Sequence, residues 1–448
     1  MTRVLFVSAE PVGEAMAGPA IRVIELARVL AEHCDVTVAA PGPSDPAVVP
    51  GRLLEAGLAG FEVLLEAMRG HDVVVAQRLQ PQLLRYAARL PVRLVADLYN
   101  PQMIEVLEAG GPGEGESSWR RAWRSMLGGC AAADLVICAS EKQRDLWLGG
   151  MALNGLVDPE RYRADPTFRA FVDVVPFGLP SEPPRHDAPV VKGVWPGIGP
   201  DDRVLLWAGG IWRWLDAITP IRAVERLRAE RPDLHLVFMG TGRPALEPGD
   251  VPTSANEAIH FARECGLEGT CVHFNPGWVN YAERGAYLME ADVGVSAHHD
   301  HLEARFSFRT RVLDHLWAGL PSVVSSGDSI GDLVEQEGLG RTAAPGDDEA
   351  FAAALAELLD DSKRHEAVSR RAREFAPALR WSECARPLVE FCRDIDGRPP
   401  RRPPRGAVAR ATFGQYPELL ANLREQGGLG EAAKALPRHL ARALRHRA

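Results

Sequence analysis

Three arginines cluster beside a short helix that the sequence predicts in the second half of the chain. Arg305, Arg309 and Arg311 precede a helix expected over 312–318, which follows a strand expected over 293–296 and a polar loop. The amino end of a helix presents free N–H groups that attract phosphate, and arginine adds bidentate, charge-assisted contacts. Because Arg309 and Arg311 are two residues apart, they point to different sides of the helix, and we expect only one of them, Arg309, to reach a diphosphate. The alternative is that these arginines pair with surface carboxylates.

Acidic and polar residues surround this arginine cluster. Asp314 lies one turn into the expected helix, where its carboxylate could accept hydrogen bonds from ribose hydroxyls; the alternative is an ordinary acidic residue of a first turn. Upstream, His298, His299, Asp300 and His301 are consecutive. Neighbours in a single loop cannot all reach one ion, and the spacing of a structural zinc site is missing. We therefore expect no metal site here, but a polar loop that faces a cleft.

Two further groups of residues follow expected strands. Trp278 comes directly after a glycine, where its ring could lie beside a nucleobase or pack in the core. Asp97, Tyr99 and Asn100 follow a strand expected over 94–96. They could bind an acceptor or a sugar hydroxyl, or they could form only a turn before the next proline.

Two common nucleotide-binding motifs are missing or incomplete. No GxGxxG follows the first expected strand, and no GxxxxGK[ST] occurs in the chain. Residues 240–245 match GxGxxA, but prolines follow where a helix would have to begin and point at a pyrophosphate. The sequence therefore predicts neither a dinucleotide site nor a P-loop, and we expect no cofactor.

Short apolar runs alternate with amphipathic stretches, a pattern typical of parallel strands that helices cover on both faces. A first set of strands is expected at 4–7, 36–39, 73–76, 94–96, 135–138 and 172–175. The pattern then restarts, with strands expected at 204–207, 234–239, 272–274, 293–296 and 322–325. We therefore predict an α/β fold with two Rossmann-like, doubly wound parallel-sheet domains that face a cleft.

Proline-rich stretches divide the chain. Prolines are frequent over 180–200, between the two sets of strands, and over 399–404, where arginines are interspersed. We expect a first domain over 1–185 and a second domain over 186–376. A helix over 377–396 is expected to pack back on the first domain, and a basic tail with short helices is expected over 397–448.

Charge and cysteine content narrow the function classes. A net charge of −9 argues against a generally basic nucleic-acid binder, whereas the tail over 397–448 carries 11 Arg or Lys against 3 Glu. Leu436, Leu440 and Leu444 recur beside arginines, so the tail could lie on an anionic membrane surface; a solvated helix or docking on the acidic body is the alternative. Seven cysteines without a CxxC pair, and no long apolar run, predict a cytoplasmic protein that is at most peripheral to the membrane.

Several stretches resemble, in the same order, the GT-B-fold glycosyltransferases of the family 4 type. The resemblance covers roughly residues 1–396 and rests on 17–20 with 26–30, 133–141, 174–178, 207–210, 236–242 and 291–324. The strongest part is Leu313-Asp314-His315-Leu316-Trp317-Ala318-Gly319-Leu320-Pro321. The resemblance implies metal-independent transfer of a hexose or deoxyhexose, with retention, from a nucleotide diphosphate-sugar to an acceptor hydroxyl. The acceptor would be a saccharide, a lipid-linked compound or a small molecule, as in cell-surface polysaccharide or glycoconjugate assembly.

The residues and the resemblance together suggest roles for individual side chains. We expect catalytic roles for Asp97, Glu303 and Arg309, and acceptor binding by Tyr99 and Asn100. Donor binding is expected from Gly18, Gly209, Gly210, Arg213, Trp278, His298, Arg305, Phe306, Ser307 and Asp314.

The sequence also departs from the family. The nearest match to its two glutamates is Glu303 with Asp314, Ile211 stands where an arginine often follows the donor-domain glycine, and a strand that often ends in histidine ends here in Asp97. Two alternatives therefore stay open: a nucleotide-sugar-binding protein without turnover, and a GT-B-type nucleotide-sugar epimerase.

Overall fold

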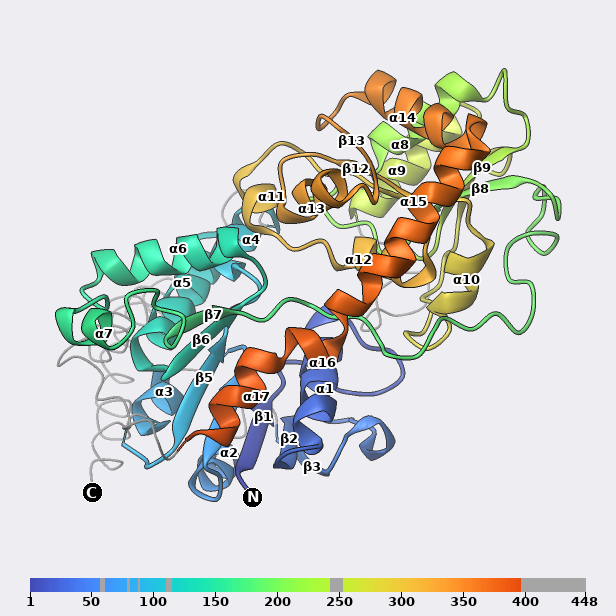
Figure 1. Cartoon of the computed structure of the whole chain (residues 1–448). Helices are drawn as coiled ribbons and strands as arrows, with labels where there is room; N and C mark the ends of the chain where they lie inside the picture. The colour runs from blue at the N-terminus through green and yellow to red at the C-terminus, as the bar shows by residue number, and fades with distance from the viewer. Residues whose placement is uncertain (57–60, 79–80, 88, 110–114, 242–252, 396–448) are drawn as a thin grey trace, which may run out of the picture.

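Two parallel β-sheets follow one another along the chain, and helices cover both faces of each sheet (Figure 1). The computed structural model describes residues 1–56, 61–78, 81–87, 89–109, 115–241 and 253–395. The prediction of an α/β fold with two Rossmann-like domains is confirmed. The tail over 397–448 and most of the GxGxxA match lie outside the described residues.

The first sheet has seven parallel strands in the order β3-β2-β1-β4-β5-β6-β7. The strands are β1 (Arg3–Val7), β2 (Asp35–Ala40), β3 (Arg52–Glu55), β4 (Val73–Ala76), β5 (Arg93–Asp97), β6 (Leu135–Cys138) and β7 (Val172–Val174). The helices are α1 (Gly18–Ala31), η1 (Pro46–Val48), α2 (Phe61–Arg69), α3 (Pro81–Ala87), α4 (Gln102–Ala109), α5 (Gly115–Ala132), α6 (Glu141–Leu153) and α7 (Pro159–Ala164). Central strands such as β4 are buried along their whole length, as coverage on both faces requires.

The second sheet has six parallel strands in the order β10-β9-β8-β11-β12-β13. The strands are β8 (Arg203–Trp207), β9 (Leu234–Phe238), β10 (Val272–Phe274), β11 (Val293–Ser296), β12 (Ser322–Ser325) and β13 (Gly340–Ala343). The helices are α8 (Ile218–Leu227), α9 (Thr253–Glu264), α10 (Arg284–Glu290), α11 (Leu302–Phe306), α12 (Thr310–Ala318), α13 (Ser329–Glu337), α14 (Asp348–Asp360) and α15 (Ser362–Phe375).

Two edge strands, β3 and β13, were not expected from the sequence. β3 has the sequence RLLE and β13 has GRTA, so neither shows a continuous apolar run. Each pairs on one side only. All four residues of β3 and the two central residues of β13 are at least partly exposed, which weakens the hydrophobic signal that marks the central strands.

Helix α12 packs directly on strand β11 because Gly294 has no side chain. A Cβ at Gly294 would lie 2.4 Å from Nδ1 of His315. His315 is buried, its Nδ1 lies 3.1 Å from Ser322 Oγ, and burial lowers its pKa to about 3. The helix that carries Arg311 and Asp314 is thereby held close to the sheet.

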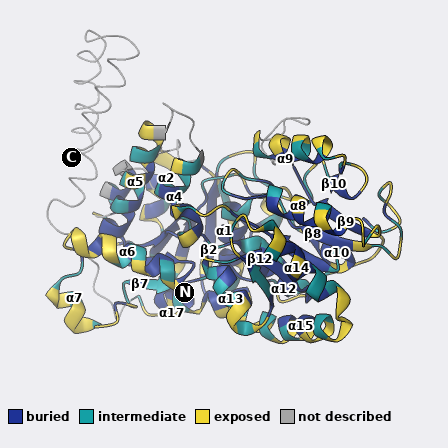
Figure 2. Ribbon diagram, turned by 90° about the horizontal axis from the view of Figure 1, so that it is seen from above, coloured by how far each residue is buried: buried dark blue, intermediate teal, exposed yellow. Residues whose placement is uncertain are grey.

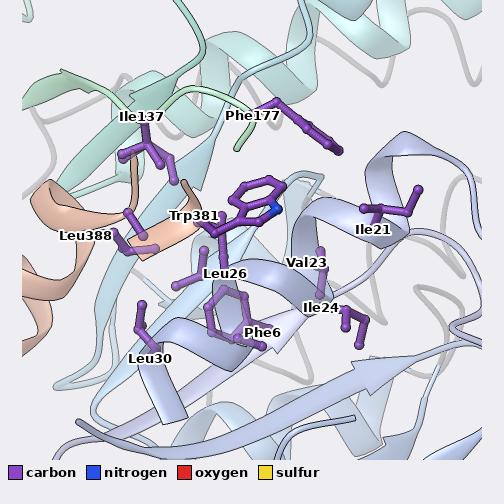
Figure 3. Close-up of a cluster of buried hydrophobic side chains, with 14 of the residues drawn as sticks. Phe6, Ile21, Val23, Ile24, Leu26, Leu30, Ile137, Phe177, Trp381 and Leu388 are labelled. Carbon is purple, nitrogen blue, oxygen red and sulfur yellow. The ribbon is translucent and has the colours of Figure 1, made fainter. Parts of the chain in front are cut away.

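After α15 the chain returns to the first domain through η2 (Ala376–Leu379), α16 (Trp381–Cys384) and α17 (Arg386–Arg393) (Figure 1). Figure 3 shows Trp381 and Leu388 packed with Phe6, Leu26 and Leu30 of the first domain. The Trp381 and Phe177 rings are 4.7 Å apart, and a Cβ at Gly178 would lie 2.7 Å from Trp381. The chain therefore crosses between the domains twice, and the second crossing is anchored in the first core.

Buried residues fill the sheets and the inner helix faces, whereas exposed residues gather on outer helices such as α7, α9 and α15 (Figure 2). None of the described helices combines the length and the apolar character that a membrane crossing needs.

Candidate functional site

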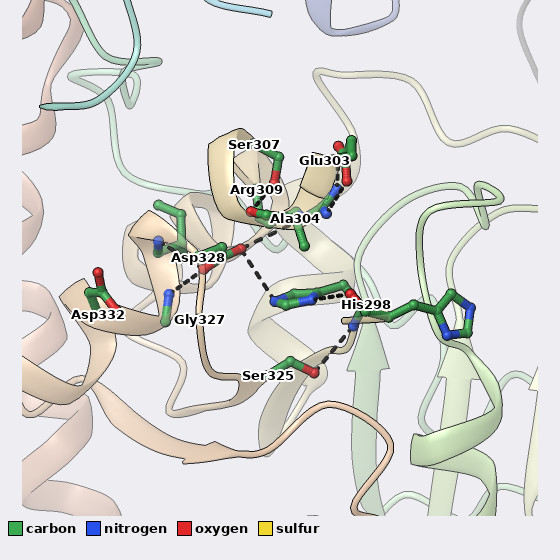
Figure 4. A network of polar contacts seen from close by, with 12 residues as sticks. His298, Glu303, Ala304, Ser307, Arg309, Ser325, Gly327, Asp328 and Asp332 are labelled. Atoms are coloured by element: carbon green, nitrogen blue, oxygen red, sulfur yellow. Dashed lines mark hydrogen bonds and ion pairs between the residues drawn. The ribbon is translucent and has the colours of Figure 1, made fainter. Parts of the chain in front are cut away.

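A buried ionic network lies beyond the ends of strands β11 and β12 of the second sheet (Figure 4). Glu303 accepts two hydrogen bonds from Arg309, from Nη1 to Oε1 at 3.2 Å and from Nη2 to Oε2 at 2.6 Å. Arg309 Nε and His298 Nε2 lie 3.7 Å and 3.8 Å from Oδ2 of Asp328. All four residues are at most 7% exposed. The structure thus brings together three expected site residues and adds Asp328.

Helix caps fix the members of this network in place. Asp328 caps α13 because its Oδ1 accepts two N–H groups of the first turn, at 3.0 Å and 2.6 Å, which leaves Oδ2 to face Arg309. His301 caps α11 because its Nδ1 accepts the N–H of Ala304 at 3.1 Å. The polar run that begins at His298 therefore ends a strand and starts a helix. Within the described part of the chain, no group of three His, Cys, Asp or Glu side chains could hold a metal ion.

Burial controls the charges in this network. It raises the pKa of Glu303, although Arg309 opposes the shift, and it lowers the pKa of His298, although Asp328 opposes that shift. Around this network, three buried nitrogen atoms have no hydrogen-bond partner among the described residues: His298 Nε2, His301 Nε2 and Arg309 Nε. Buried polar atoms without partners are rare and costly, so these three mark positions where a polar ligand would gain hydrogen bonds.

Arg311 lies beside this network and has no carboxylate within ion-pair distance among the described residues. Its Nη2 donates to the carbonyl oxygen of Gly210 at 3.0 Å, and its guanidinium lies 4.8 Å from the centre of the Trp207 ring. Its Nη1 is buried without a hydrogen-bond partner. Burial, with a further contribution from nearby Arg309, lowers the pKa of Arg311 to about 9. Arg311 is therefore a shielded cation at the end of β8, next to Gly209 and Gly210.

Gly209 has a conformation that other residues rarely adopt, with a φ of 125°. A Cβ there would meet Nη2 of Arg311 only at 4.0 Å, an ordinary contact, so the backbone conformation and not crowding favours glycine at this position. Two of the expected donor-binding glycines thus adjoin the shielded cation.

Asp314 lies on the same helix as Arg311 and accepts a hydrogen bond from Nε of Arg284 at 3.0 Å. The Arg284 guanidinium lies 3.6 Å from the Tyr281 ring centre and 4.5 Å from the Trp317 ring centre. The Asp314 side chain remains 22% exposed. A positioned carboxylate therefore stands within one turn of the shielded Arg311 cation.

The remaining expected donor residues occupy different positions. Ser307 is buried and donates to the carbonyl oxygen of Ala304 at 3.3 Å. Trp278 is half-buried, and its Nε1 lacks a partner. Arg213 and Arg305 are exposed, and no contact of either side chain with this network is found among the described residues.

In the first domain, Asp97 forms a buried ion pair with Arg22. Arg22 Nε donates to Asp97 Oδ2 at 2.8 Å, and Nη2 donates to Oδ1 at 2.9 Å. The same guanidinium donates to the carbonyl oxygens of Val175 at 2.8 Å and Pro176 at 3.0 Å, and it lies 4.8 Å from the Tyr99 ring centre. The Asp97 and Arg22 side chains are 2% and 0% exposed. Both oxygens of Asp97 are thus engaged, and its neighbours at the strand end are held in place.

The other expected first-domain residues lie at the same end of the sheet. A Cβ at Gly18 would lie 3.9 Å from the Tyr99 hydroxyl oxygen, and Asn100 Oδ1 is buried without a partner. Glu105 on α4, which no motif indicated, also faces the second domain. Burial raises its pKa to about 7, and the nearby Glu303 carboxylate adds to the shift.

Gln143 joins the two sets of residues. Its Nε2 donates at 2.8 Å to the carbonyl oxygen of Tyr99 in the first domain and, at 2.8 Å, to that of Phe306 in the second. The expected acceptor and donor residues therefore meet between the sheets, where a buried cation, a carboxylate and unpartnered donors could hold a polar, negatively charged ligand.

Comparison with known proteins links the second domain to a family. Residues 202–361 match the family model for "Glycosyl transferases group 1". A D-inositol 3-phosphate glycosyltransferase of Thermobispora bispora is 29% identical over 213 residues, which make up 47% of this chain and 47% of that protein. The match thus spans about half the length of this curated relative.

Solved structures share the fold of both domains. Sucrose-phosphate synthase from Thermosynechococcus elongatus superposes with a TM-score of 0.63 at 16% identity, over 89% of this chain and 100% of that one. Anabaena HepE in complex with UDP-glucose superposes with a TM-score of 0.62 at 14% identity, also over 89% and 100%. The chain therefore has the two-domain GT-B fold of these structures, and its second domain is similar to the group 1 glycosyl transferases.

Proposed function

We propose that the protein transfers a sugar from a nucleotide diphosphate-sugar to an acceptor hydroxyl, and that the second domain binds the donor. In this reaction the bond between the anomeric carbon and the β-phosphate oxygen breaks, and the anomeric carbon bonds to the acceptor oxygen. The acceptor proton passes to the leaving diphosphate. Negative charge therefore develops on the diphosphate, and fixed positive groups lower the barrier most.

The observation that carries this proposal is the shielded Arg311. Its guanidinium lacks a carboxylate partner among the described residues, its Nη1 is unpartnered, and its lowered pKa reflects the cost of holding a cation there. A diphosphate would supply the missing charge and hydrogen bonds. Arg309 is already neutralised by Glu303, so Arg311 is the better ligand of the two.

The rest of the donor has complementary neighbours. The Asp314 carboxylate could accept ribose hydroxyls, and the Trp278 ring could lie beside the base. His298, Glu303 and Arg309, whose hydrogen-bonding potential is incompletely used, could bind the sugar hydroxyls. Because HepE, which shares the fold, was solved in complex with UDP-glucose, a uridine nucleotide is the first to test.

We propose that the acceptor enters along the first-domain side, at Tyr99, Asn100 and Glu105. Two observations support this proposal: Asn100 Oδ1 is buried without a hydrogen-bond partner among the described residues, and Glu105 lies near the Glu303 carboxylate. Asp97 would then act through Arg22, by holding the end of β5 that presents Tyr99. Retention at the anomeric carbon, which the family resemblance implies, can be tested by NMR of the product.

The proposal is tested by thermal shift with UDP, GDP, ADP and dTDP, followed by turnover with the matching nucleotide sugars. We expect at least one nucleotide to stabilise the protein and its sugar conjugate to be consumed. Arg311→Met should weaken binding, whereas Arg370→Met, at an exposed position of α15, should not. Binding without turnover would indicate a protein without transferase activity, and release of an epimerised sugar would indicate an epimerase.

We further propose that the basic tail over 397–448 brings the enzyme to an anionic membrane that holds a lipid-linked acceptor. The tail's excess of basic residues supports this role, because each basic residue near such a surface contributes roughly 1 kcal/mol. The full chain should co-sediment with anionic liposomes at low salt, and a chain truncated after Gly397 should not. Equal and weak sedimentation of both would contradict it.

A further inference from the structure

Helix α11, which carries Glu303, contacts two helices of the first domain, α4 and α6 (Figure 1). α11 has only five residues, and the loops on both sides of it hold His298 and Arg309. The position of the donor network therefore depends on first-domain helices as well as on the second sheet.

Gln143 makes the buried link between α6 and α11. Its side chain is fully buried, and its Oε1 accepts the N–H of Ala139 at 2.8 Å. One bond from Nε2 goes to the Tyr99 carbonyl and the other crosses to the Phe306 carbonyl, both at 2.8 Å. Two of these three bonds orient the amide within the first domain. The remaining N–H is thus aimed at the second domain before the domains meet.

Lys142, the preceding residue, makes a second link at a different point. Its Nζ donates to the Gly327 carbonyl oxygen at 3.1 Å and lies 2.7 Å from Oδ2 of Asp332. Gly327 directly precedes Asp328, which caps α13 and faces Arg309 and His298. The Lys142 and Asp332 side chains are 28% and 43% exposed, so this pair is accessible to salt and to mutation.

We propose that Gln143 and Lys142 form an interdomain latch: positioning residues that hold the segments carrying Glu303 and Asp328 in register when the domains meet. Gln143 secures the end of α11, and Lys142 secures the start of α13. A polar bond that is buried on contact is costly to leave unmade, so losing the Gln143 link favours separation of the domains. Losing the exposed Lys142 pair acts in the same direction but more weakly. The consequence for catalysis rests on the proposed function, whereas the latch itself does not.

The latch can be measured by Förster transfer between dyes on the two domains of the full chain. Leu153→Cys on α6 and Met289→Cys on α10 provide exposed attachment sites, with Cys265→Ser to remove the partly exposed native thiol. Gln143→Glu places a carboxylate oxygen against two carbonyl oxygens. Lys142→Asp and Asp332→Lys each break the exposed pair, and the double exchange restores it with reversed polarity.

We expect Gln143→Glu to reduce the population with the domains in contact by about tenfold, and each single charge change to reduce it two- to fivefold. The double exchange re-forms the charge pair but not the bond to the Gly327 carbonyl, so it should restore part of the lost population. Gln336→Glu, at an exposed position of α13, should leave the distribution unchanged. If Gln143→Glu fails to fold, the charge exchange still decides the question.

Unchanged transfer efficiency in both folded single charge variants, or no rescue by the exchange, would overturn the latch. A parallel thermal-shift titration with UDP, GDP, ADP and dTDP separates this outcome from failure of the proposed function. Nucleotide binding with unchanged transfer efficiency refutes the latch alone. A rescued latch without binding of any nucleotide refutes the donor site alone.

Discussion

Breaking the Arg22–Asp97 pair should destabilise the first domain strongly. Arg22→Met leaves the Asp97 carboxylate buried without its two donors and also removes the bonds to the Val175 and Pro176 carbonyls. Loss of one partner from a buried pair typically costs about 3–5 kcal/mol. At 2–4 °C per kcal/mol for a domain of roughly this size, the melting temperature should fall by about 6–20 °C.

The controls use the same chemistry in other settings. Arg69→Met breaks an ion pair with Glu66 on α2, whose side chains are 52% and 78% exposed, and should cost less than about 1 kcal/mol. The double variant Arg22→Met with Asp97→Asn removes both buried charges, so it should be more stable than Arg22→Met alone.

The assay is thermal unfolding followed by circular dichroism, combined with donor turnover. If Asp97→Asn keeps the wild-type melting temperature yet abolishes turnover, Asp97 acts on the substrate and our positioning role for it is wrong. If the double variant is less stable than Arg22→Met, the electrostatic reasoning is wrong.

Three further predictions concern pH and metal ions. The pKa of Glu105 is raised to about 7 from 4.5, so between these pH values the folded protein holds a proton there that the unfolded chain releases. Stability is therefore lost as pH rises from 4.5 to 7. Glu105→Gln should raise the melting temperature at about pH 8 but not at pH 4.5. His273 is buried beside His235, and its pKa is lowered to about 4 from 6.5. Stability should therefore fall as pH falls from 6.5 to 4. His273→Gln should flatten this dependence on pH, whereas His260→Gln, on the surface, should not. Turnover should survive EDTA, as the resemblance implies; loss that Mg²⁺ or Mn²⁺ restores would contradict it.

The sequence was sufficient for the fold but not for the pairing of charges within the site. Central strands such as Val73–Ala76 are apolar throughout, and their periodicity predicts them directly. The edge strand Gly340–Ala343 carries no such signal and is recognised only by its pairing with β12. Glycine is needed at position 340 because a Cβ there would lie 2.0 Å from the Ser322 carbonyl oxygen. Local patterns describe cores well and edges poorly.

The charged side chains of the site pair with groups from other elements, which explains why sequence patterns did not predict these pairs. The i, i+2 spacing predicted that only one of Arg309 and Arg311 reaches a diphosphate, and the sequence favoured Arg309, whereas we now propose Arg311. That choice depends on Glu303, six residues upstream of Arg309, and on Gly210, about a hundred residues away. Gln143 and Glu105 belong to no motif, and only the approach of the two domains gives them a role.

The central claim is that Arg311 binds the diphosphate of a sugar nucleotide. Calorimetric titration of UDP, GDP, ADP and dTDP into the wild type and Arg311→Met tests it directly. A hydrogen bond to a charged group contributes about 1.5–3 kcal/mol, so we predict at least tenfold weaker binding in the variant. Its ligand-free melting temperature should be unchanged or higher, because the variant removes a shielded cation that has no carboxylate partner in the described part of the chain. Equal affinity in both proteins, or no binding of any of the four nucleotides to the wild type, would contradict the account.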